Sequence, residues 1–315
     1  MNVDAEALHQ VFPYSRSAWK IVADFVELMK PELTSLSVLT AICSFYLAHF
    51  GAWSAADVWL LANLALGTTL VGGGAGALNQ YLERNYDAKM KRTEKRPLPS
   101  GRLMPGTVLA FGIILSSIGL LELTFAVNTL TGFLGVVTLT TYLFLYTPLK
   151  RISPVATTIG GIPGALPPLM GWVAARNEIT FGAMVLFVIL FFWQMPHFFS
   201  LAWLYRKDYA RAGYRLLTVV DDSGTRTSRH VLGNCAALLP LSLIPSVIGM
   251  TSTLYFFGAL AAGIGFLFFG IMFASSFVSA QQENFARTNL FARRLFFASL
   301  VYLPVLFFLM VIDKV

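Results

Sequence analysis

Residues 57–80 read DVWLLANLALGTTLVGGGAGALNQ, and the chain continues directly into 81–87, YLERNYD. The first part is long and apolar enough to cross a lipid bilayer as a helix, which takes about 20 mostly apolar residues. The second part carries carboxylates and a cation where such a helix would leave the bilayer. This stretch therefore predicts an all-α membrane protein with polar chemistry at a helix end.

The composition of the whole chain indicates the same class. Of its 315 residues, 56% are hydrophobic and only 12% are charged, and the mean hydropathy is +0.67. These values lie far from those of an ordinary soluble domain. We predict a single domain over 1–315 that forms one bundle of nine transmembrane helices within about 33–312. The predicted spans are approximately 33–53, 57–80, 106–127, 129–147, 153–175, 180–203, 231–250, 253–277 and 293–312.

The cations are distributed unequally between the two sides of this bundle. Taking the nine spans in order puts 21 of the 23 Lys and Arg residues on one side and leaves Arg176 and Lys314 on the other. Cytoplasmic loops carry the Lys/Arg excess, so residues 1–31 should be a cytoplasmic segment and the C-terminus should be periplasmic. The long loops 81–105 and 204–230 then face the cytoplasm and are the expected functional loops.

The same distribution limits the possible partners. A charge of +7 suggests nucleic acid, but the cations are spread over juxtamembrane loops, where topology and anionic membrane lipid account for them. We therefore expect no nucleic acid partner. Cys43 and Cys235 lie inside predicted spans without paired spacing, so neither a disulfide nor a zinc site is implied. The first 30 residues resemble neither a signal peptide nor a transit peptide, which favours a bacterial inner membrane.

Asn79, Glu83 and Asp87 are spaced four residues apart, so they share one face of a helix. Amide and carboxylate oxygens suit Mg²⁺, which commonly takes one or two carboxylates and completes its shell with water and phosphate oxygens. Arg92 and Arg96 follow, and their planar side chains match phosphate oxygens. The alternative is that the charges beside the helix are solvated topological signals, which suits the neighbouring lysines better than the aligned acids.

The stretch 79–102, NQYLERNYDAKMKRTEKRPLPSGR, resembles the first signature of the intramembrane UbiA-type prenyltransferases, and within them the branch that farnesylates heme. The resemblance covers roughly 25–310. It continues through 146–151 (YTPLKR), 162–168 (IPGALPP), 193–199 (WQMPHFF) and 205–213 (YRKDYARAG). It implies a nine-helix bundle with a central cavity that opens to the cytoplasmic side.

The resemblance also implies an activity. The farnesyl group of farnesyl diphosphate would be joined to a vinyl group of heme B, with addition of water, giving heme O and diphosphate. Mg²⁺ would be the cofactor, and a heme A synthase or a terminal oxidase would be a downstream partner. The implied metal-binding and catalytic residues are Asn79, Glu83, Asp87 and Asp208. The implied substrate-binding residues are Arg92, Arg96, Tyr146, Lys150, Arg151, His197, Tyr205 and Lys207.

Some of these residues have simpler interpretations. Many relatives carry several aspartates after the sixth span, whereas the matching loop here offers Asp208, which could instead pair with Arg206 or Arg211. The tyrosines could belong to the interfacial aromatic belt. His197 could be a packed, hydrogen-bonded residue, or it could contact heme iron or handle a proton, and Pro196 should disrupt its helix.

The fifth span is rich in small residues and prolines, so its helix is expected to be broken or tightly packed against the cavity. These residues are Gly160, Gly161, Pro163, Gly164, Pro167 and Pro168.

Other functional classes remain open at this point. A secondary transporter also uses broken helices and buried charges, but its ionisable groups should cluster near the middle of the membrane. A noncatalytic heme-handling protein would explain His197 but gives no reason for the acidic stripe. Among enzymes, the alternative is a prenyltransferase acting on a quinone or chlorin precursor.

Overall fold

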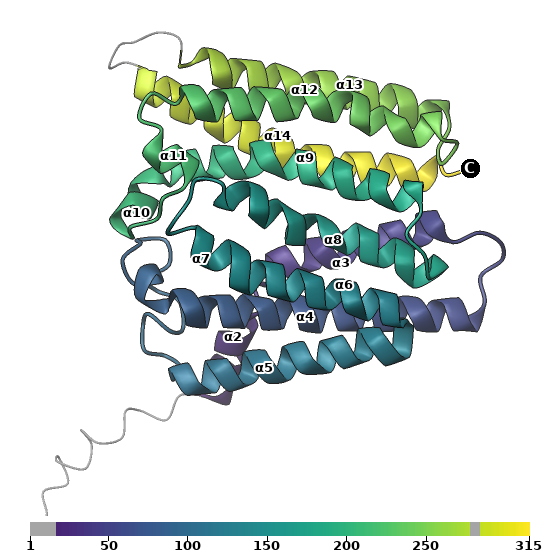
Figure 1. The fold of residues 1–315 in the computed structure, drawn as a ribbon, viewed down its shortest axis with the longest axis horizontal. Helices are drawn as coiled ribbons and strands as arrows, with labels where there is room; N and C mark the ends of the chain where they lie inside the picture. The colour runs from purple at the N-terminus through teal and green to yellow at the C-terminus, as the bar shows by residue number, and fades with distance from the viewer. Residues whose placement is uncertain (1–16, 278–283) are drawn as a thin grey trace, which may run out of the picture.

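The computed structural model describes residues 17–277 and 284–315, and within this part the chain is helical with no β-strand. The long helices run side by side (Figure 1). The first half comprises α2 (Ala18–Leu28), α3 (Pro31–Ala48), α4 (Ala55–Asp87), α5 (Pro105–Leu121), η1 (Glu122–Val127), α6 (Thr129–Thr140), η2 (Thr141–Tyr146) and α7 (Thr147–Leu149). The second half comprises α8 (Ala156–Arg176), α9 (Phe181–Leu204), α10 (Arg206–Arg211), α11 (Leu217–Val220), α12 (Thr225–Val247), α13 (Thr253–Ser275) and α14 (Asn284–Ile312).

Each of the nine predicted spans overlaps a helical segment of the described chain, although the first, 33–53, runs past the end of α3 at Ala48. Eight of these segments are long and apolar enough to cross a membrane. The ninth, α8, has three prolines in its interior and is not among the eight. The all-α membrane fold is therefore confirmed, and the chain is a multi-pass membrane protein, whereas the exact count of nine spans is not confirmed. Residues 1–16 of the predicted cytoplasmic segment lie outside the described residues.

Helix α4 extends beyond its predicted apolar span at both ends. At its start the Ser54 hydroxyl accepts from the backbone N–H of Asp57, while the Asp57 carboxylate accepts from the backbone N–H of Ser54, a capping box. At its end the helix continues past residue 80 to Asp87, whose carbonyl oxygen accepts from the Thr93 hydroxyl at 2.8 Å. The polar stripe therefore lies on regular helix and not in a loop.

Small residues bring the helices close together around the middle of the bundle. A Cβ added at Gly171 of α8 would lie 1.9 Å from the carbonyl oxygen of Ala41 in α3. A Cβ at Gly161 would lie 2.3 Å from Met195 in α9. Close backbone approach at small residues is the usual way in which membrane helices pack. Of the two expectations for the fifth span, the helix is therefore tightly packed and not broken.

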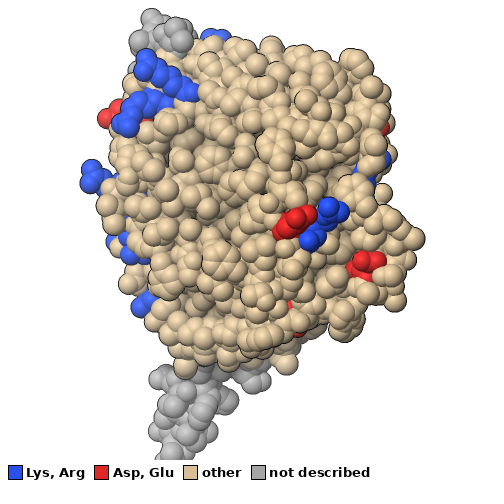
Figure 2. All heavy atoms as spheres, turned by 45° about the vertical axis from the view of Figure 1, so that its right-hand side comes forward, with Lys and Arg blue, Asp and Glu red and all other residues tan. Residues whose placement is uncertain are grey.

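The charges separate to the two ends of the bundle, as the loop analysis predicts. Figure 2 shows a broad uncharged surface, with Lys and Arg gathered at one edge and a few charges near the opposite edge. Arg176 and Lys314 lie at that opposite end, where both approach the ring of Phe50, at 5.4 and 5.0 Å. Lys314 also donates to the carbonyl oxygens of Tyr46 and His49. We call this the outer end and the Lys/Arg-rich end the inner end.

Candidate active site

The stripe on α4 is buried at the inner end of the bundle. Asn79 and Asp87 are each 1% exposed and Glu83 is 4% exposed. Their spacing of four residues places them on one face of a regular helix, and that face turns toward other elements of the chain. A carboxylate removed from water needs an opposite charge or several hydrogen bonds, so the groups opposite this face determine what it can do.

Each member of the stripe contacts a cation from a different part of the chain. The contacts are Lys30 Nζ to Asn79 Oδ1 at 2.7 Å, Lys150 Nζ to Glu83 Oε1 at 2.6 Å, and Arg96 Nη1 to Asp87 Oδ2 at 2.8 Å. Lys150 and Arg96 are among the site residues predicted from the sequence, whereas Lys30 is not. Acidic and basic groups therefore alternate in a small volume, an arrangement that can hold both a divalent cation and a multiply charged anion.

Lys150 is placed by the wide turns of η2, which lead into the short helix α7. The Thr147 hydroxyl donates to the Tyr142 carbonyl at 2.8 Å and accepts from Asn79 Nδ2 at 3.1 Å, which ties this turn to α4. The Lys150 ammonium lies 4.6 Å from the centre of the Tyr146 ring. Burial alone would lower the pKa of Lys150, but the Glu83 carboxylate holds that pKa well above its ordinary value. Lys150 is therefore a permanent cation of the site.

Lys30 joins α2 to α3 in a left-handed backbone conformation, with φ 49° and ψ 62°. This conformation is uncommon for a residue other than glycine, and here it turns the side chain inward to Asn79. Burial, followed by the nearby Arg96 guanidinium, lowers the pKa of Lys30 to about 7. The sequence signal was a lysine immediately before Pro31 at the start of an apolar helix, which we interpreted only as a topological charge.

The remaining candidate cations occupy two different places. The Arg92 guanidinium lies 4.6 Å from the Tyr209 ring centre and 5.1 Å from that of Tyr205, so it joins the loop after α4 to α10. Arg151 lies 3.9 Å from the Tyr86 ring centre and donates to the Leu82 carbonyl at 3.1 Å. Arg151 therefore supports the backbone of α4, whereas Arg92 lies where the two long inner loops meet.

Asp208 and Lys207 lie on α10. Asp208 pairs with Arg211 at 3.0 Å, one of the two partners that the simpler interpretation proposed, and Lys207 is exposed. In the described parts of the chain, no three His, Cys, Asp or Glu side chains are grouped so that they could hold a metal ion. The amide oxygen and two carboxylates of α4 nevertheless fit Mg²⁺, because this ion commonly uses one or two carboxylates and takes its other ligands from water and phosphate.

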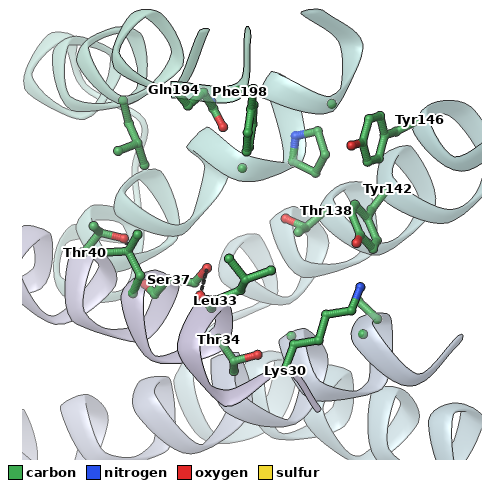
Figure 3. Close-up of a pocket in the computed structure, with 18 of the residues that line it drawn as sticks. Lys30, Leu33, Thr34, Ser37, Thr40, Thr138, Tyr142, Tyr146, Gln194 and Phe198 are labelled. Carbon is green, nitrogen blue, oxygen red and sulfur yellow. Dashed lines mark hydrogen bonds between the residues drawn. The ribbon is translucent and has the colours of Figure 1, made fainter. Parts of the chain in front are cut away.

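A cavity of about 270 Å³ adjoins the stripe and runs between α3, α4, η2, α8 and α9. Lys30, Tyr142 and Tyr146 line one part of it, and Gln194 and Phe198 of α9 line another (Figure 3). Its walls are mostly apolar or aromatic. Lys30 belongs to both the cavity and the charged cluster, so a ligand with a charged head and an apolar tail could occupy both at once.

His197 also lines this cavity. Its Nδ1 lies 2.8 Å from the Ser299 hydroxyl oxygen on α14, so it is the packed, hydrogen-bonded residue of the simpler interpretation and still borders the cavity. The prediction that Pro196 disrupts the helix is wrong, because α9 is continuous from Phe181 to Leu204. Packing against α8, α12 and α14 supports the turn from which the proline removes one hydrogen bond.

The sequence is similar to those of known proteins over most of its length. The chain matches the model of the UbiA prenyltransferase family over residues 37–310. It is 44% identical over 297 residues to the protoheme IX farnesyltransferase of Solibacter usitatus, covering 92% of this chain and 98% of that relative. It is 43% identical over 293 residues to the protoheme IX farnesyltransferase of Opitutus terrae, covering 93% and 95%.

Solved structures share the fold at low sequence identity. A digeranylgeranylglyceryl phosphate synthase aligns with a TM-score of 0.75 at 14% identity, covering 93% of this chain and 98% of that one. A UbiA homolog from Archaeoglobus fulgidus, bound to GPP and Mg²⁺, aligns with a TM-score of 0.64 at 13% identity, covering 89% and 99%. At these identities the likeness concerns the fold alone.

Proposed function

The chain belongs to the UbiA prenyltransferase family, and from that premise we propose that it transfers the farnesyl group of farnesyl diphosphate to a vinyl group of protoheme IX (heme B). Water is added in the same reaction, and the products are heme O and diphosphate. The observation that carries this proposal is the 44% identity to a protoheme IX farnesyltransferase over nearly the full length of both chains. The charged cluster beside an apolar cavity suits substrates with an anionic head and a large apolar body.

We propose that Asn79, Glu83 and Asp87, with Asp208 from α10, hold Mg²⁺ for this reaction. The burial of the α4 stripe and its hard oxygen donors support the proposal, as does the Mg²⁺ in the homolog from Archaeoglobus fulgidus. When bound, Mg²⁺ would neutralise charge on the diphosphate. Asp208 would have to exchange Arg211 for the ion, so we expect it to contribute less than the α4 stripe.

The residues of the chain have two tasks in this mechanism. Lys150 and Arg96 supply positive charge at the diphosphate, and Lys30 adds to it when its ammonium is protonated. Arg92, which lies against the rings of Tyr205 and Tyr209, and Lys207 extend this charge toward α10. As the bond between C1 of farnesyl and oxygen breaks, the bonding electrons leave on the diphosphate, where fixed cations stabilise them. The rings of Tyr142 and Tyr146 border the resulting allylic cation and keep water away from it.

The new carbon–carbon bond then forms from the electrons of the vinyl group of heme. This leaves a cation next to the porphyrin ring, to which water adds with loss of one proton. Carbon, oxygen and charge are balanced by the release of diphosphate and that proton. Arg151 is proposed to act indirectly, because its contacts are to α4 itself.

We further propose a bacterial inner membrane with the inner end of the bundle in the cytoplasm, so that the N-terminus is cytoplasmic and the C-terminus periplasmic. The support is the Lys/Arg excess at that end. Heme O would then be consumed by a heme A synthase or a terminal oxidase, a prediction that rests on resemblance to the family.

The decisive experiment supplies membranes containing the protein with farnesyl diphosphate, Mg²⁺ and heme, and identifies the porphyrin product by mass. We expect heme with one added farnesyl group and one added water. A prenylated quinone or chlorin precursor, formed while heme stayed unmodified, would instead favour the alternative substrate class. The exposed Glu94, changed to Gln, is the matched control for carboxylate variants, because it lies in the loop that follows α4, outside the buried stripe.

A further inference from the structure

Ser299 on α14 holds two aromatic side chains of α9. Its backbone carbonyl accepts from Trp193 Nε1 at 2.9 Å, and its hydroxyl oxygen lies 2.8 Å from His197 Nδ1. Ser299 is fully buried, whereas Trp193 and His197 both line the cavity. A single residue outside the cavity therefore fixes two residues of its wall.

The hydrogen bonds of Ser299 determine where the proton of His197 lies. The Ser299 hydroxyl oxygen is 2.5 Å from the Phe296 carbonyl oxygen, and two oxygens come this close only with a proton between them. A carbonyl has no proton, so the single hydroxyl proton of Ser299 is donated there. The contact between Ser299 and His197 must therefore use a proton on Nδ1, and Nε2 of the neutral ring keeps its lone pair.

Two aromatic rings, those of Trp193 and Phe296, stack against the His197 imidazole. The Trp193 ring centre lies 5.2 Å away at an interplanar angle of 24°, and the Phe296 ring centre lies 4.9 Å away at 30°. Within residues 17–277 and 284–315, the one hydrogen bond of the His197 ring is that of Nδ1. The ring is therefore stacked against two aromatic side chains and bonded through one nitrogen, and Nε2 is its remaining polar atom.

We propose that Ser299 is a positioning residue that holds neutral His197 with its Nε2 lone pair directed to the cavity, as the axial ligand for the iron of the heme substrate. This inference rests on the proposed function, because that function makes heme the acceptor. A neutral imidazole is the usual histidine ligand of iron. The group that binds its other nitrogen fixes the ring and tunes its basicity.

The test is a titration of the purified protein with heme, without farnesyl diphosphate, followed by the Soret band and by resonance Raman spectra of the iron–histidine bond. Loss of such a partner typically costs about 10- to 100-fold in metal affinity, so Ser299→Ala should weaken heme binding by that factor. Ser299→Thr keeps the hydroxyl and should restore the spectrum, and His197→Ala should remove the histidine signature.

The replacements leave the bond to Trp193 in place, because that bond uses the Ser299 backbone. Ser276→Ala is the matched control: Ser276 is also buried and its hydroxyl donates to a phenylalanine carbonyl three residues earlier, at 2.6 Å. If Ser299→Ala failed to fold, Ser299→Cys would replace the oxygen by a weak sulfur acceptor of similar shape and should also weaken heme binding.

The inference would be overturned if His197→Ala kept the wild-type Soret band and Raman spectrum, or if Ser299→Ala bound heme as tightly as Ser276→Ala. Farnesylated heme produced by membranes in either case would leave the proposed function intact. Conversely, a histidine-ligated heme spectrum without any prenylated product would retain the inference and reject the function.

Discussion

Both acidic sites at the inner end contain carboxylates paired with cations, but the pairs on α4 are more buried than the pair on α10. On α4, Glu83 and Asp87 are buried, and each contacts a cation from a separate element of the fold. On α10, Asp208 pairs with Arg211 of the same six-residue helix, and the arginine side chain is 47% exposed. From this difference we infer that a carboxylate is held in one position when it is buried and contacts a cation from another segment of the chain. A charged neighbour in the sequence does not have that effect.

The largest expected effect is on stability and comes from breaking the buried pair. Lys150→Met leaves Glu83 without its partner in a buried site, which should lower the free energy of unfolding by roughly 3–5 kcal/mol. The double variant Lys150→Met with Glu83→Gln should recover much of that loss. Denaturant unfolding in detergent measures both. Arg211→Met, which breaks the half-exposed pair, should cost less than about 1 kcal/mol, and equal losses at the two sites would remove the distinction between them.

The next largest effect is on catalysis. Asp87→Asn removes a charge from the proposed metal site and should lower farnesyl transfer by about 10²- to 10³-fold, the scale seen when one electrostatic contact to a transition state is lost. Initial rates of product formation at saturating Mg²⁺ measure it, with Glu94→Gln as the control. Unchanged rates in Asp87→Asn, or full activity after removal of divalent ions by a chelator, would contradict the metal proposal.

A smaller loss is expected at the second site. Asp208→Asn should reduce the rate by about tenfold, equivalent to about 1.4 kcal/mol, because this carboxylate is less buried and already has Arg211 as a partner. The informative measurement is the Mg²⁺ concentration needed for half-maximal rate, which should rise in Asp208→Asn. A rate and Mg²⁺ requirement equal to those of the wild type would assign Asp208 to the surface ion pair alone.

The last expected effect is a dependence of stability on pH, which is small only over a narrow pH interval. The pKa of Lys30 is about 7 in the folded protein and 10.5 ordinarily, so between these values the unfolded chain binds more protons. The free energy of unfolding should therefore rise with pH above 7, by at most about 1.4 kcal/mol per pH unit, and this contribution should be flat below 7. Lys30→Met should remove that rise and Lys20→Met, at an exposed position, should keep it. The same slope in both variants would show that Lys30 is charged normally.

Much of the fold was predictable because hydropathy and charge act along the chain. Each run of apolar residues that we predicted as a span overlaps a helical segment, eight of which are long and apolar enough to cross a membrane. The spacing of Asn79, Glu83 and Asp87 predicted that they would share a face. The ends of the helices were less predictable. Helix α14 begins at Asn284, well before the predicted residue 293, because tertiary packing continues a helix past the point where its sequence becomes polar.

The contacts of the site could not be predicted, because they join residues far apart in sequence. Lys30 reaches Asn79 across 49 positions and His197 reaches Ser299 across 102. The periodicity of apolar residues in the sequence does not predict such contacts. Lys30 resembled a topological charge and Ser299 an ordinary small residue of an apolar helix. Only the packing of α2, α4, α9 and α14 distinguishes them from their neighbours.

The contact between Gly171 and Ala41 has a consequence for how the cavity can change. Here two main chains touch, with no room for even a methyl group between them, so α3 has no slack on the side of α8. Rotation of side chains cannot create space between these two helices. A flat, rigid tetrapyrrole that needs more width therefore cannot gain it by a closer approach of α3 and α8, and another wall of the cavity has to supply the space.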